Sequence, residues 1–352
     1  LWAILKALEL KDQDEVLLQA FTCNASVNPI LWLNLKPVYV DCQDDFNLDA
    51  DDLERKITPK SKVLIVQHTF GLPADMDRII EICRRHNLFL IEDCAHSLGA
   101  EYKGRKAGTF GQASFFSFSR DKIISSVYGG LAAAKDPELA AKIKRISDNL
   151  EYPACFWIFQ QLIHPLVLNY LILPVYNFID LGKIFLVFMQ WTHILSKAVH
   201  WKEKRGLCPS YFPRKFPNAL AFLALNQFEK LDKFQVHRTK MANRYAEALR
   251  ESAFELPKDS PEKKPAFLRY AVRHKKAHNI IWNSWNRENI LLGDWYTCPV
   301  APCDTKLEKM EYVAGSCPNA ERFSKTTLNL PTHINIKEND FRRILDFLGK
   351  YK

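Results

Sequence analysis

The sequence predicts an α/β fold, with a mainly parallel, mixed sheet in a large domain and a smaller α+β domain at the C-terminal end. Three observations carry this prediction. Short apolar runs alternate with helical patterns over residues 16–135, as in strand–helix–strand units. The 352 residues suffice for one large and one smaller domain. Residues 265–350 mix strand-like runs with a closing helix.

The large domain is predicted over residues 1–150. Its apolar runs, each expected to form a strand, are Val16–Thr22, Val38–Cys42, Lys62–Thr69, Leu88–Asp93, Ala113–Ser119 and Gly130–Ala134. Helical patterns cover Asp51–Ile57 and Asp75–Asn87, and another helix is expected from Asp136, where a capping residue precedes proline. The chain opens at Leu1 inside an apolar helical pattern, which indicates that the start of this domain is missing.

An apolar helical insert is predicted at residues 151–206. Residues 152–179 contain no Asp, Glu, Lys or Arg, and such a run reaches the length of about 20 residues that spans a bilayer. Three prolines and several amide side chains argue against one straight span. A pair of membrane-surface or re-entrant helices is one interpretation, because the basic cluster Lys197–Arg205 follows and suits anionic headgroups. A buried or dimer-covering insert is the other.

The remaining residues, 207–352, are predicted to hold a long helix and the small α+β domain. The helix is expected over residues 218–250, where apolar side chains recur at a helical period. Arg269–Arg273 and Thr326–Leu330 are strand-like, and Glu338–Leu348 is expected to form the closing helix.

The composition indicates which kinds of partner and which cellular compartment to expect. The net charge is +9 and the pI about 9.0, which favours anionic partners such as phosphorylated ligands or a membrane surface. No zinc-finger spacing or RNA-binding aromatic pattern is present, so nucleic acid is not expected. The nine cysteines are scattered and odd in number, as in a cytosolic protein with reduced thiols. Cys298 and Cys303 lack metal-ligand spacing, so no metal site is expected.

The chemistry is indicated by an acid and a lysine at the ends of two neighbouring predicted strands. Asp93 closes the run Leu88–Asp93, and Lys122 follows the run Ala113–Ser119. Pyridoxal phosphate (PLP) enzymes need such a pair: the lysine forms a Schiff base with the cofactor, and the acid keeps the pyridine nitrogen protonated. Ligands of open α/β sheets gather at the carboxyl ends of strands, where these residues are expected to lie.

Several motifs in this order and spacing resemble one known family. They are Asp14-Glu-Val, Phe21-Thr22, Pro37–Asp41, Gln67–Asp77, Ile91–Ala100, Gly108–Gly111, Ser114–Gly130, Gln227–Asp232 and Leu328–His333. Together they resemble the DegT–DnrJ–StrS nucleotide-sugar aminotransferases, which are PLP enzymes of the aspartate-aminotransferase fold (fold type I). The resemblance runs almost from end to end but does not cover the insert.

The resemblance implies a homodimer with active sites at the subunit interface. It also implies transfer of an amino group, usually from glutamate, to a keto group on a nucleotide-linked sugar in polysaccharide or glycan synthesis. By the family's positions, Lys122 is the catalytic lysine and proton carrier, and Asp93 holds the pyridinium nitrogen. His96 lies near the cofactor's O3′, Ser117 binds the phosphate, and Thr22 lies near the cofactor.

Three departures from the family pattern bear on cofactor binding. Cys23 stands where relatives often have an aromatic residue that stacks on the cofactor ring. The Ser-Gly-Thr turn that cradles the phosphate falls before Leu1. Relatives also carry a Gly-x-Asn segment that reaches the partner subunit's phosphate; here the corresponding stretch is Tyr211-Phe-Pro-Arg214-Lys215, and Arg214 or Lys215 is expected to supply the charge.

Two rival functions are weighed against the aminotransferase. A PLP-dependent sugar dehydratase is disfavoured because that branch of the family replaces the lysine with histidine, whereas this chain has Lys122. A catalytically idle, membrane-associated scaffold is suggested by Cys23, Pro213 and the insert, and amino-donor chemistry on PLP would exclude it. The expected location is the cytoplasm, peripheral to the inner membrane face if the segment 152–205 contacts lipid.

Overall fold

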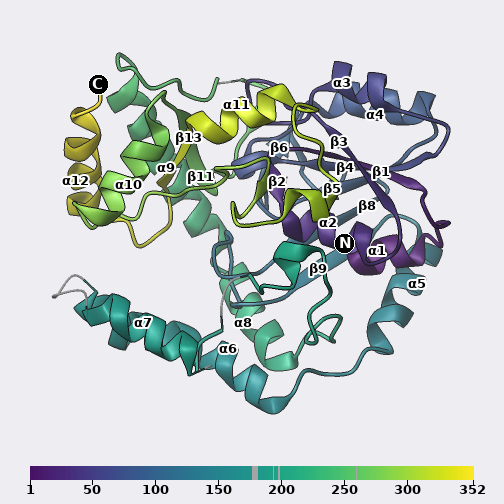
Figure 1. Cartoon of the computed structure of the whole chain (residues 1–352), viewed down its shortest axis with the longest axis horizontal. Helices are drawn as coiled ribbons and strands as arrows, with labels where there is room; N and C mark the ends of the chain where they lie inside the picture. The colour runs from purple at the N-terminus through teal and green to yellow at the C-terminus, as the bar shows by residue number, and fades with distance from the viewer. Residues whose placement is uncertain (177–180, 193, 197–198, 259) are drawn as a thin grey trace.

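The computed structural model describes residues 1–176, 181–192, 194–196, 199–258 and 260–352 (Figure 1). The strands of the main sheet are β1 (Glu15–Gln19), β3 (Lys36–Val40), β4 (Ser61–Gln67), β5 (Phe89–Asp93), β8 (Ala113–Ser117) and β9 (Gly130–Ala134). The other strands are β2 (Thr22–Cys23), β6 (Glu101–Tyr102), β7 (Arg105–Lys106), β10 (Lys263–Lys264), β11 (Arg269–Arg273), β12 (Val300–Ala301) and β13 (Thr327–Pro331).

The α-helices are α1 (Trp2–Ala7), α2 (Asn24–Leu31), α3 (Ala50–Lys56), α4 (Met76–Arg85), α5 (Pro137–Asp148), α6 (Cys155–Val167), α7 (Leu181–Trp191), α8 (Asn218–Phe228), α9 (Leu231–Leu249), α10 (Ala277–Asn286), α11 (Pro318–Thr326) and α12 (Glu338–Gly349). Shorter helical turns are η1 (Thr69–Gly71), the π turn η2 (Leu168–Ile172), η3 (Leu173–Val175), η4 (Glu203–Arg205) and η5 (Leu307–Met310).

The predicted sheet is confirmed as mainly parallel and mixed. Its strand order is β3-β1-β4-β5-β8-β9; neighbouring strands are parallel except β9, which runs antiparallel to β8. Both faces of the central strands β1, β4 and β5 are buried, whereas the edge strand β9 is largely exposed. In β1, Val16 and Leu18 join one apolar cluster while Leu17 joins the other, because successive side chains of a strand point to opposite faces. Residues of α3 and α4 pack in the cluster of Leu17, and residues of α1, α2 and α5 in that of Val16.

The C-terminal region packs separately from the main sheet. β11 pairs antiparallel with β13, and α9, α10 and α12 bury apolar side chains against that pair. The single long helix predicted at 218–250 is wrong: α8 ends at Phe228, and Lys230 (φ −100°, ψ 4°) leaves the helical region before α9 begins. The break follows a change of packing, since α8 contacts α6 whereas α9 buries Met241 and Tyr245 in the C-terminal core.

Two apolar helices form an arm, defined here as α6, η2, η3 and α7, which extends from the body in Figure 1. Pro165 does not end the first helix, because the wider π turn η2 follows it and the run continues to Val175. By length and composition alone, Cys155–Val175 is apolar enough to cross a membrane, and 28% of its most apolar window is buried. Residues 177–180 of the charge-free run and residues 197–198 of the basic cluster lie outside the described residues.

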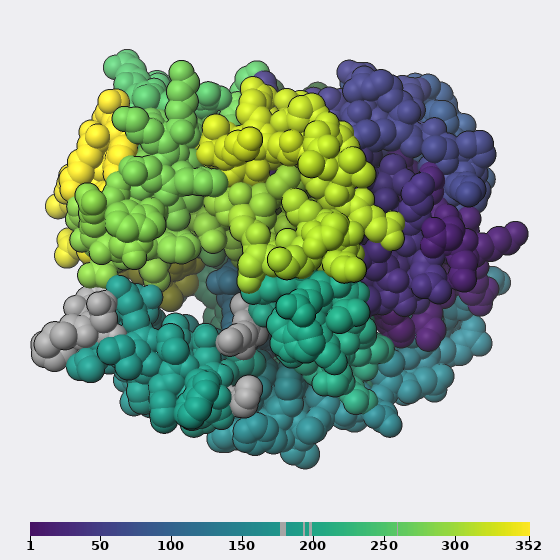
Figure 2. Space-filling view, in the orientation of Figure 1, coloured from purple at the N-terminus to yellow at the C-terminus, as the bar shows by residue number. Residues whose placement is uncertain are grey.

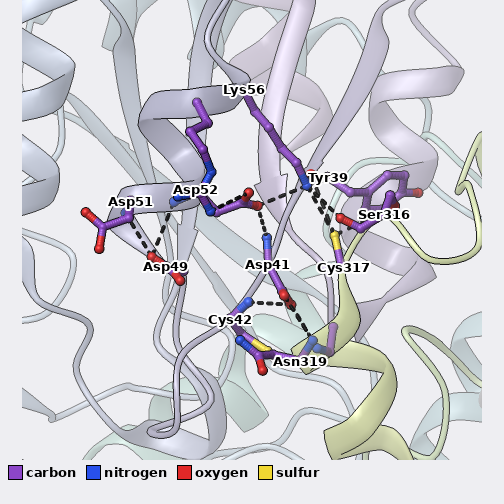
Figure 3. Close-up of polar contacts among 12 residues, drawn as sticks. Tyr39, Asp41, Cys42, Asp49, Asp51, Asp52, Lys56, Ser316, Cys317 and Asn319 are labelled. Carbon is purple, nitrogen blue, oxygen red and sulfur yellow. Dashed lines mark hydrogen bonds and ion pairs between the residues drawn. The ribbon is translucent and has the colours of Figure 1, made fainter.

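A buried polar network fastens the main sheet to the C-terminal region (Figure 3). Asp41, just after β3, accepts hydrogen bonds from the N–H groups of Asn319 and Ala320 at the start of α11, at 2.9 and 2.8 Å. Lys56 at the end of α3 donates to the carbonyls of Tyr39 and Ser316, at 2.8 and 3.0 Å. Each residue therefore joins segments that lie far apart in the sequence.

Candidate active site

The predicted acid and lysine lie on the carboxyl-end side of the sheet. Asp93 is the last residue of β5, Ser117 is the last residue of β8, and Lys122 lies in the loop between β8 and β9. β5 and β8 are neighbouring parallel strands, so their ends meet at one edge. The chain therefore brings both residues to the edge at which ligands of α/β sheets bind.

Asp93 is a buried carboxylate whose hydrogen bonds come from one side chain and one backbone group. Ser26 of α2 donates its hydroxyl to Oδ2, and the Ala95 N–H donates to Oδ1, both at 2.9 Å. Burial raises the pKa of this carboxyl, although these hydrogen bonds and the charge of Lys122 act in the opposite direction. The ionised form of a buried carboxyl group with a raised pKa is stabilised by a cation or by a charged N–H donor at close range.

Lys122 is half-buried, and its amine lies over an aromatic ring. Its Nζ is 4.9 Å from the centroid of the Trp295 ring. Burial lowers the pKa of the amine, while the nearby Cys23 and Asp93 act to raise it. The neutral, nucleophilic form of the amine is therefore more populated than it would be in a solvent-exposed lysine. Lys122 and Asp93 each influence the other's pKa, so they share one electrostatic environment.

His96 is a buried, neutral histidine held between aromatic rings. Its ring stacks on Trp295 at 5.4 Å and on Phe70 at 6.2 Å between centroids. Burial lowers its pKa well below the ordinary value, and the positive charge of Lys122 adds to this effect. Nδ1 accepts the Phe70 N–H at 3.3 Å, so Nε2 carries the proton and faces the Tyr296 hydroxyl, also at 3.3 Å. His96 can therefore donate a hydrogen bond from Nε2 without carrying a charge.

The two predicted hydroxyl residues differ in their local contacts. Ser117 Oγ lies 3.3 Å from the Ser119 hydroxyl. The Thr22 hydroxyl donates to the Gln67 side chain at 2.7 Å, and its backbone N–H donates to the Pro299 carbonyl. Thr22 thus fixes the segment that carries Cys23, which is the largest of the influences that oppose the lowering of the pKa of Lys122.

Glu92 and His68 make structural contacts within the large domain. The Glu92 carboxylate accepts the N–H groups of Gly108, Phe110 and Gly111 at 2.7 Å and lies 3.1 Å from His68 Nε2. Side chains of Glu92, His68 and Cys94 lie within 4.8 Å of one another. The Glu92 oxygens are already used by backbone donors, which explains this grouping without a metal ion.

Sequence reasoning missed three residues of the site. Ser26 has no motif that marks it as a partner of Asp93. Trp295 lies in none of the predicted elements or motifs, and Arg269 is predicted only as the start of a strand. Trp295 contacts both cations, since the Arg269 guanidinium carbon lies 5.4 Å from its ring centroid.

The basic residues expected to replace the family's asparagine have local partners. Arg214 pairs with Glu151, and Lys215 lies 3.8 Å from Asp148 and over the ring of Tyr152. These contacts place both residues beside the end of α5.

Comparison with known proteins decides the family. The profile of the DegT/DnrJ/EryC1/StrS aminotransferase family matches residues 1–150 and 198–349. The chain belongs to this family. The match leaves out residues 151–197, which include the whole arm, so the family pattern gives no account of it.

Relatives in the family include enzymes of sugar and polysaccharide synthesis. The chain is 43% identical over 141 residues to GDP-perosamine synthase of Caulobacter vibrioides, covering 40% of this chain and 38% of that protein. It is 26% identical over 353 residues to the spore coat polysaccharide biosynthesis protein SpsC of Bacillus subtilis, covering 98% and 81%. The alignments with the first curated relatives span less than two fifths of their length.

Solved structures show the fold over nearly the whole chain. The putative sugar aminotransferase Spr1654 from Streptococcus pneumoniae, in its PLP form, matches with a TM-score of 0.76 at 21% identity, covering 99% of this chain and 83% of that one. DesV of S. venezuelae, solved with a ketimine intermediate, matches with a TM-score of 0.74 at 23% identity, covering 99% and 81%. The predicted PLP-transferase fold is confirmed.

The residues around Lys122 fit the cofactor of this family. A buried carboxylate at Asp93 suits a protonated ring nitrogen, and a half-buried amine of lowered pKa at Lys122 suits attachment to an aldehyde. His96 offers a neutral N–H donor beside them. The hydroxyl of Ser117 suits a phosphate oxygen.

Proposed function

We propose that this protein is a PLP-dependent aminotransferase that moves an amino group, from glutamate in the first instance, to a keto group of a nucleotide-linked sugar. The observation that carries the proposal is the shared environment of Lys122 and Asp93 at the carboxyl edge of the sheet in a chain of an aminotransferase family. The relatives named for sugar substrates support the sugar assignment.

The chain's residues supply binding and proton transfer. PLP, when bound, supplies an electrophilic aldehyde carbon and a ring that accepts electrons from the substrate carbon. Lys122 would attach to that aldehyde and then carry a proton, for which a neutral amine is required. Asp93 would hold a proton on the ring nitrogen. His96 would donate a hydrogen bond from its Nε2–H to an oxygen of the ring, and Ser117 would donate a hydrogen bond from its hydroxyl to the phosphate.

A spectroscopic measurement tests the cofactor assignment. The purified protein mixed with PLP should show the visible band of lysine-bound cofactor, and Lys122→Ala should abolish it. Lys144→Ala is the matched control, because Lys144 is exposed on α5 and pairs only with Asp148 among the described residues. Glutamate should bleach the wild-type band. A band that survives Lys122→Ala removes this residue from the role, and a wild-type protein that does not bind PLP favours the idle scaffold.

We propose a homodimer, as in the family resemblance, with each site completed by the partner subunit. Arg214 and Lys215 pair with acidic side chains of their own subunit. The residue that would contact the cofactor phosphate of the other subunit is therefore not identified. Sedimentation analysis of the purified protein gives the mass directly, and a monomer at working concentration would contradict this assignment.

We also propose that the arm binds an anionic membrane surface from the cytoplasmic side. On α7 the exposed apolar side chains recur every three to four residues and so share one face: Leu181, Ile184, Val187, Phe188 and Trp191. Tyr170 in η2 is 74% exposed and Trp191 75% exposed. The arm lies along the lower edge of the molecule in Figure 2, separated by an opening from the C-terminal region. Near its base, Lys202 and Arg205 flank the exposed Trp201, a combination suited to the headgroup region.

Flotation with liposomes tests this surface without removing the arm. Tyr170→Asp together with Trp191→Asp should abolish flotation with vesicles containing phosphatidylserine, because two charges would have to enter the apolar region. Trp282→Asp is the matched control, since Trp282 is 54% exposed on α10, in the C-terminal region. Equal flotation of both variants would contradict the proposal, as would a double variant that stays bound while the oligomer dissociates.

A further inference from the structure

The loop between β8 and β9 carries Lys122 on a tight turn. The Lys122 N–H donates to the Ser119 carbonyl at 3.2 Å, so Arg120 and Asp121 are the two central residues of the turn. Asp121 is exposed, whereas Arg120 is half-buried. Whatever holds the Arg120 side chain therefore also holds the turn, and with it the backbone of Lys122.

Arg120 is held by residues from the two ends of the arm. Its guanidinium donates to the Ser196 carbonyl at 2.7 Å and to the Gln161 side-chain oxygen at 3.4 Å, and it also donates to the Ser196 hydroxyl. Gln161 lies on α6, and Ser196 follows α7. The Ser196 hydroxyl in turn donates to Gln161 Oε1 at 3.0 Å. Arg120 thus joins the segments of both arm helices to the turn.

This contact is buried, although most of the arm is exposed. Gln161 is 1% exposed, and Gln160 and His164 beside it on α6 are buried too. Burial lowers the pKa of His164 to about 4, and the positive charge of Arg120 acts in the same direction. The hydrogen-bond partners of Arg120 among the described residues are neutral oxygens. The buried polar side chains of the arm therefore gather where it meets the turn.

A second contact between the arm and this loop lies beyond the lysine. The Tyr128 ring meets the Trp157 ring of α6 edge to face, with their centroids 4.9 Å apart. Arg120 precedes Lys122 and Tyr128 follows it. The first arm helix therefore contacts the loop on both sides of the lysine.

An arginine at this junction restrains direction as well as contact. Apolar packing would fasten the arm without the cost of desolvating a guanidinium. A planar guanidinium instead fixes the orientation of the groups that it joins, because its donors form a rigid fork. Proton transfer depends on such restraint, since a displacement of about 1 Å at a reacting group can slow a reaction about 100-fold.

We propose that Arg120 is a positioning residue: by binding Gln161 and Ser196 it fastens the turn that carries Lys122 to the arm, and so sets where the Lys122 amine stands for proton transfer. The inference rests on the aminotransferase function proposed above. It adds the arm to the working parts of the site, although both partners of Arg120 lie in residues 151–197, which the family profile leaves out.

Hydrogen exchange of the full chain without added PLP tests the fastening independently of turnover. Gln161→Leu removes the acceptor on the arm and leaves Arg120 in place. Exchange of the amides in residues 118–129 should become faster on the order of 10-fold, because a hydrogen bond to a charged group is lost. Amides of β5 should exchange as in wild type. Asn169→Leu is the matched control, since the exposed Asn169 side chain in η2 donates to the Pro165 carbonyl of the arm itself.

Glutamate half-reactions of the PLP-loaded protein, measured without lipid, give the second readout. Arg120→Gln and Gln161→Leu should each lower the maximal rate about 10- to 100-fold, with the glutamate concentration at half-maximal rate little changed. Arg120→Lys should recover part of the rate, because an ammonium can still donate to the Ser196 carbonyl. Arg120→Gln combined with Gln161→Leu should be no slower than the slower single variant, because both changes remove one contact.

Four results would decide against the inference or against the function beneath it. Wild-type rates in both single variants overturn the inference and leave the aminotransferase function intact, even if exchange of the loop becomes faster. Effects that multiply in the double variant also overturn it, because Arg120 would then act independently of the arm. If Arg120→Gln does not fold, a wild-type rate in Gln161→Leu overturns it alone. A wild-type protein without the band of lysine-bound cofactor removes the proposed function instead.

Discussion

Two buried polar regions of this molecule differ in how their charges are satisfied. In the network of Figure 3, the oxygens of Asp41 accept backbone N–H groups of α11, and Lys56 lies 2.9 Å from Asp52 Oδ2 while donating to two carbonyls. Around Trp295, the half-buried cations Lys122 and Arg269 have few protein acceptors within the described residues. Arg269 Nε, for example, has none among the described residues. The first region is complete by itself, whereas the second is arranged for a ligand.

The largest expected effect comes from Lys122→Met, which should separate stability from activity. Amino transfer should fall by roughly 10⁴-fold or more, because the proton carrier is lost. The free energy of unfolding of the cofactor-free protein should stay within about 1 kcal/mol of wild type or rise, because a half-buried amine is replaced by an apolar side chain. Urea denaturation and glutamate half-reactions measure the two quantities. A loss above about 3 kcal/mol would mean that Lys122 also supports the fold.

Asp41→Ala should show the opposite pattern. The change leaves the N–H groups of Asn319 and Ala320 without their carboxylate acceptor, and each buried, unsatisfied donor costs about 1–3 kcal/mol. We expect a loss of about 3 kcal/mol in unfolding free energy, with PLP binding retained under conditions in which the variant is folded. Asp49→Ala is a milder control, because Asp49 caps α3 alone. Equal losses in both variants would contradict the role of Asp41 in joining the two regions.

The smallest expected effect is a difference in pH dependence between Asp52 and Asp93. Burial raises the pKa of Asp52, but hydrogen bonds from the Asp41 N–H and Lys56 outweigh it, so the net pKa is lowered. Asp52 therefore stabilises the fold above about pH 4 and loses this contribution as the pH falls through its folded pKa. The pKa of Asp93 is raised by burial, so its ionisation opposes folding as the pH rises past about 4.

Acid titrations of stability in the cofactor-free protein measure this difference. Asp52→Asn should lower stability at pH 7 and flatten its fall below pH 4, whereas Asp93→Asn should leave stability at pH 7 equal or higher. Each change should be about 1 kcal/mol or less, since solvent screens part of the Asp52 interaction. Parallel profiles for the two variants would remove the distinction between the two regions.

The sequence predicted the sheet well because strands buried on both faces appear in the sequence as short, nearly continuous apolar runs. The run Leu88–Asp93 is apolar as far as Ile91 and matches the buried parallel strand β5 within one residue at each end. The run Gly130–Ala134 matches β9, which is an exposed, antiparallel edge strand. The sequence predicted roles for Asp93 and Lys122 because both residues lie close, along the chain, to the ends of recognisable strands. Ser26, Trp295 and Arg269 were missed because each reaches the site from another part of the chain, through packing that a single sequence does not record. The break between α8 and α9 was missed for the same reason, since neither proline nor glycine marks it.

The arm interrupts the family pattern without interrupting the fold. Its buried apolar residues Val167 and Ile172 form a small cluster with Leu195, which follows the arm, and this cluster is separate from the cores on either face of the sheet. The chain on either side of it is held together by contacts such as that between Asp41 and α11. A shortened connection in place of the arm would leave those contacts in place. The fold should therefore tolerate an epitope or a fluorophore inserted in place of the arm, or division of the chain at this point in split-protein experiments.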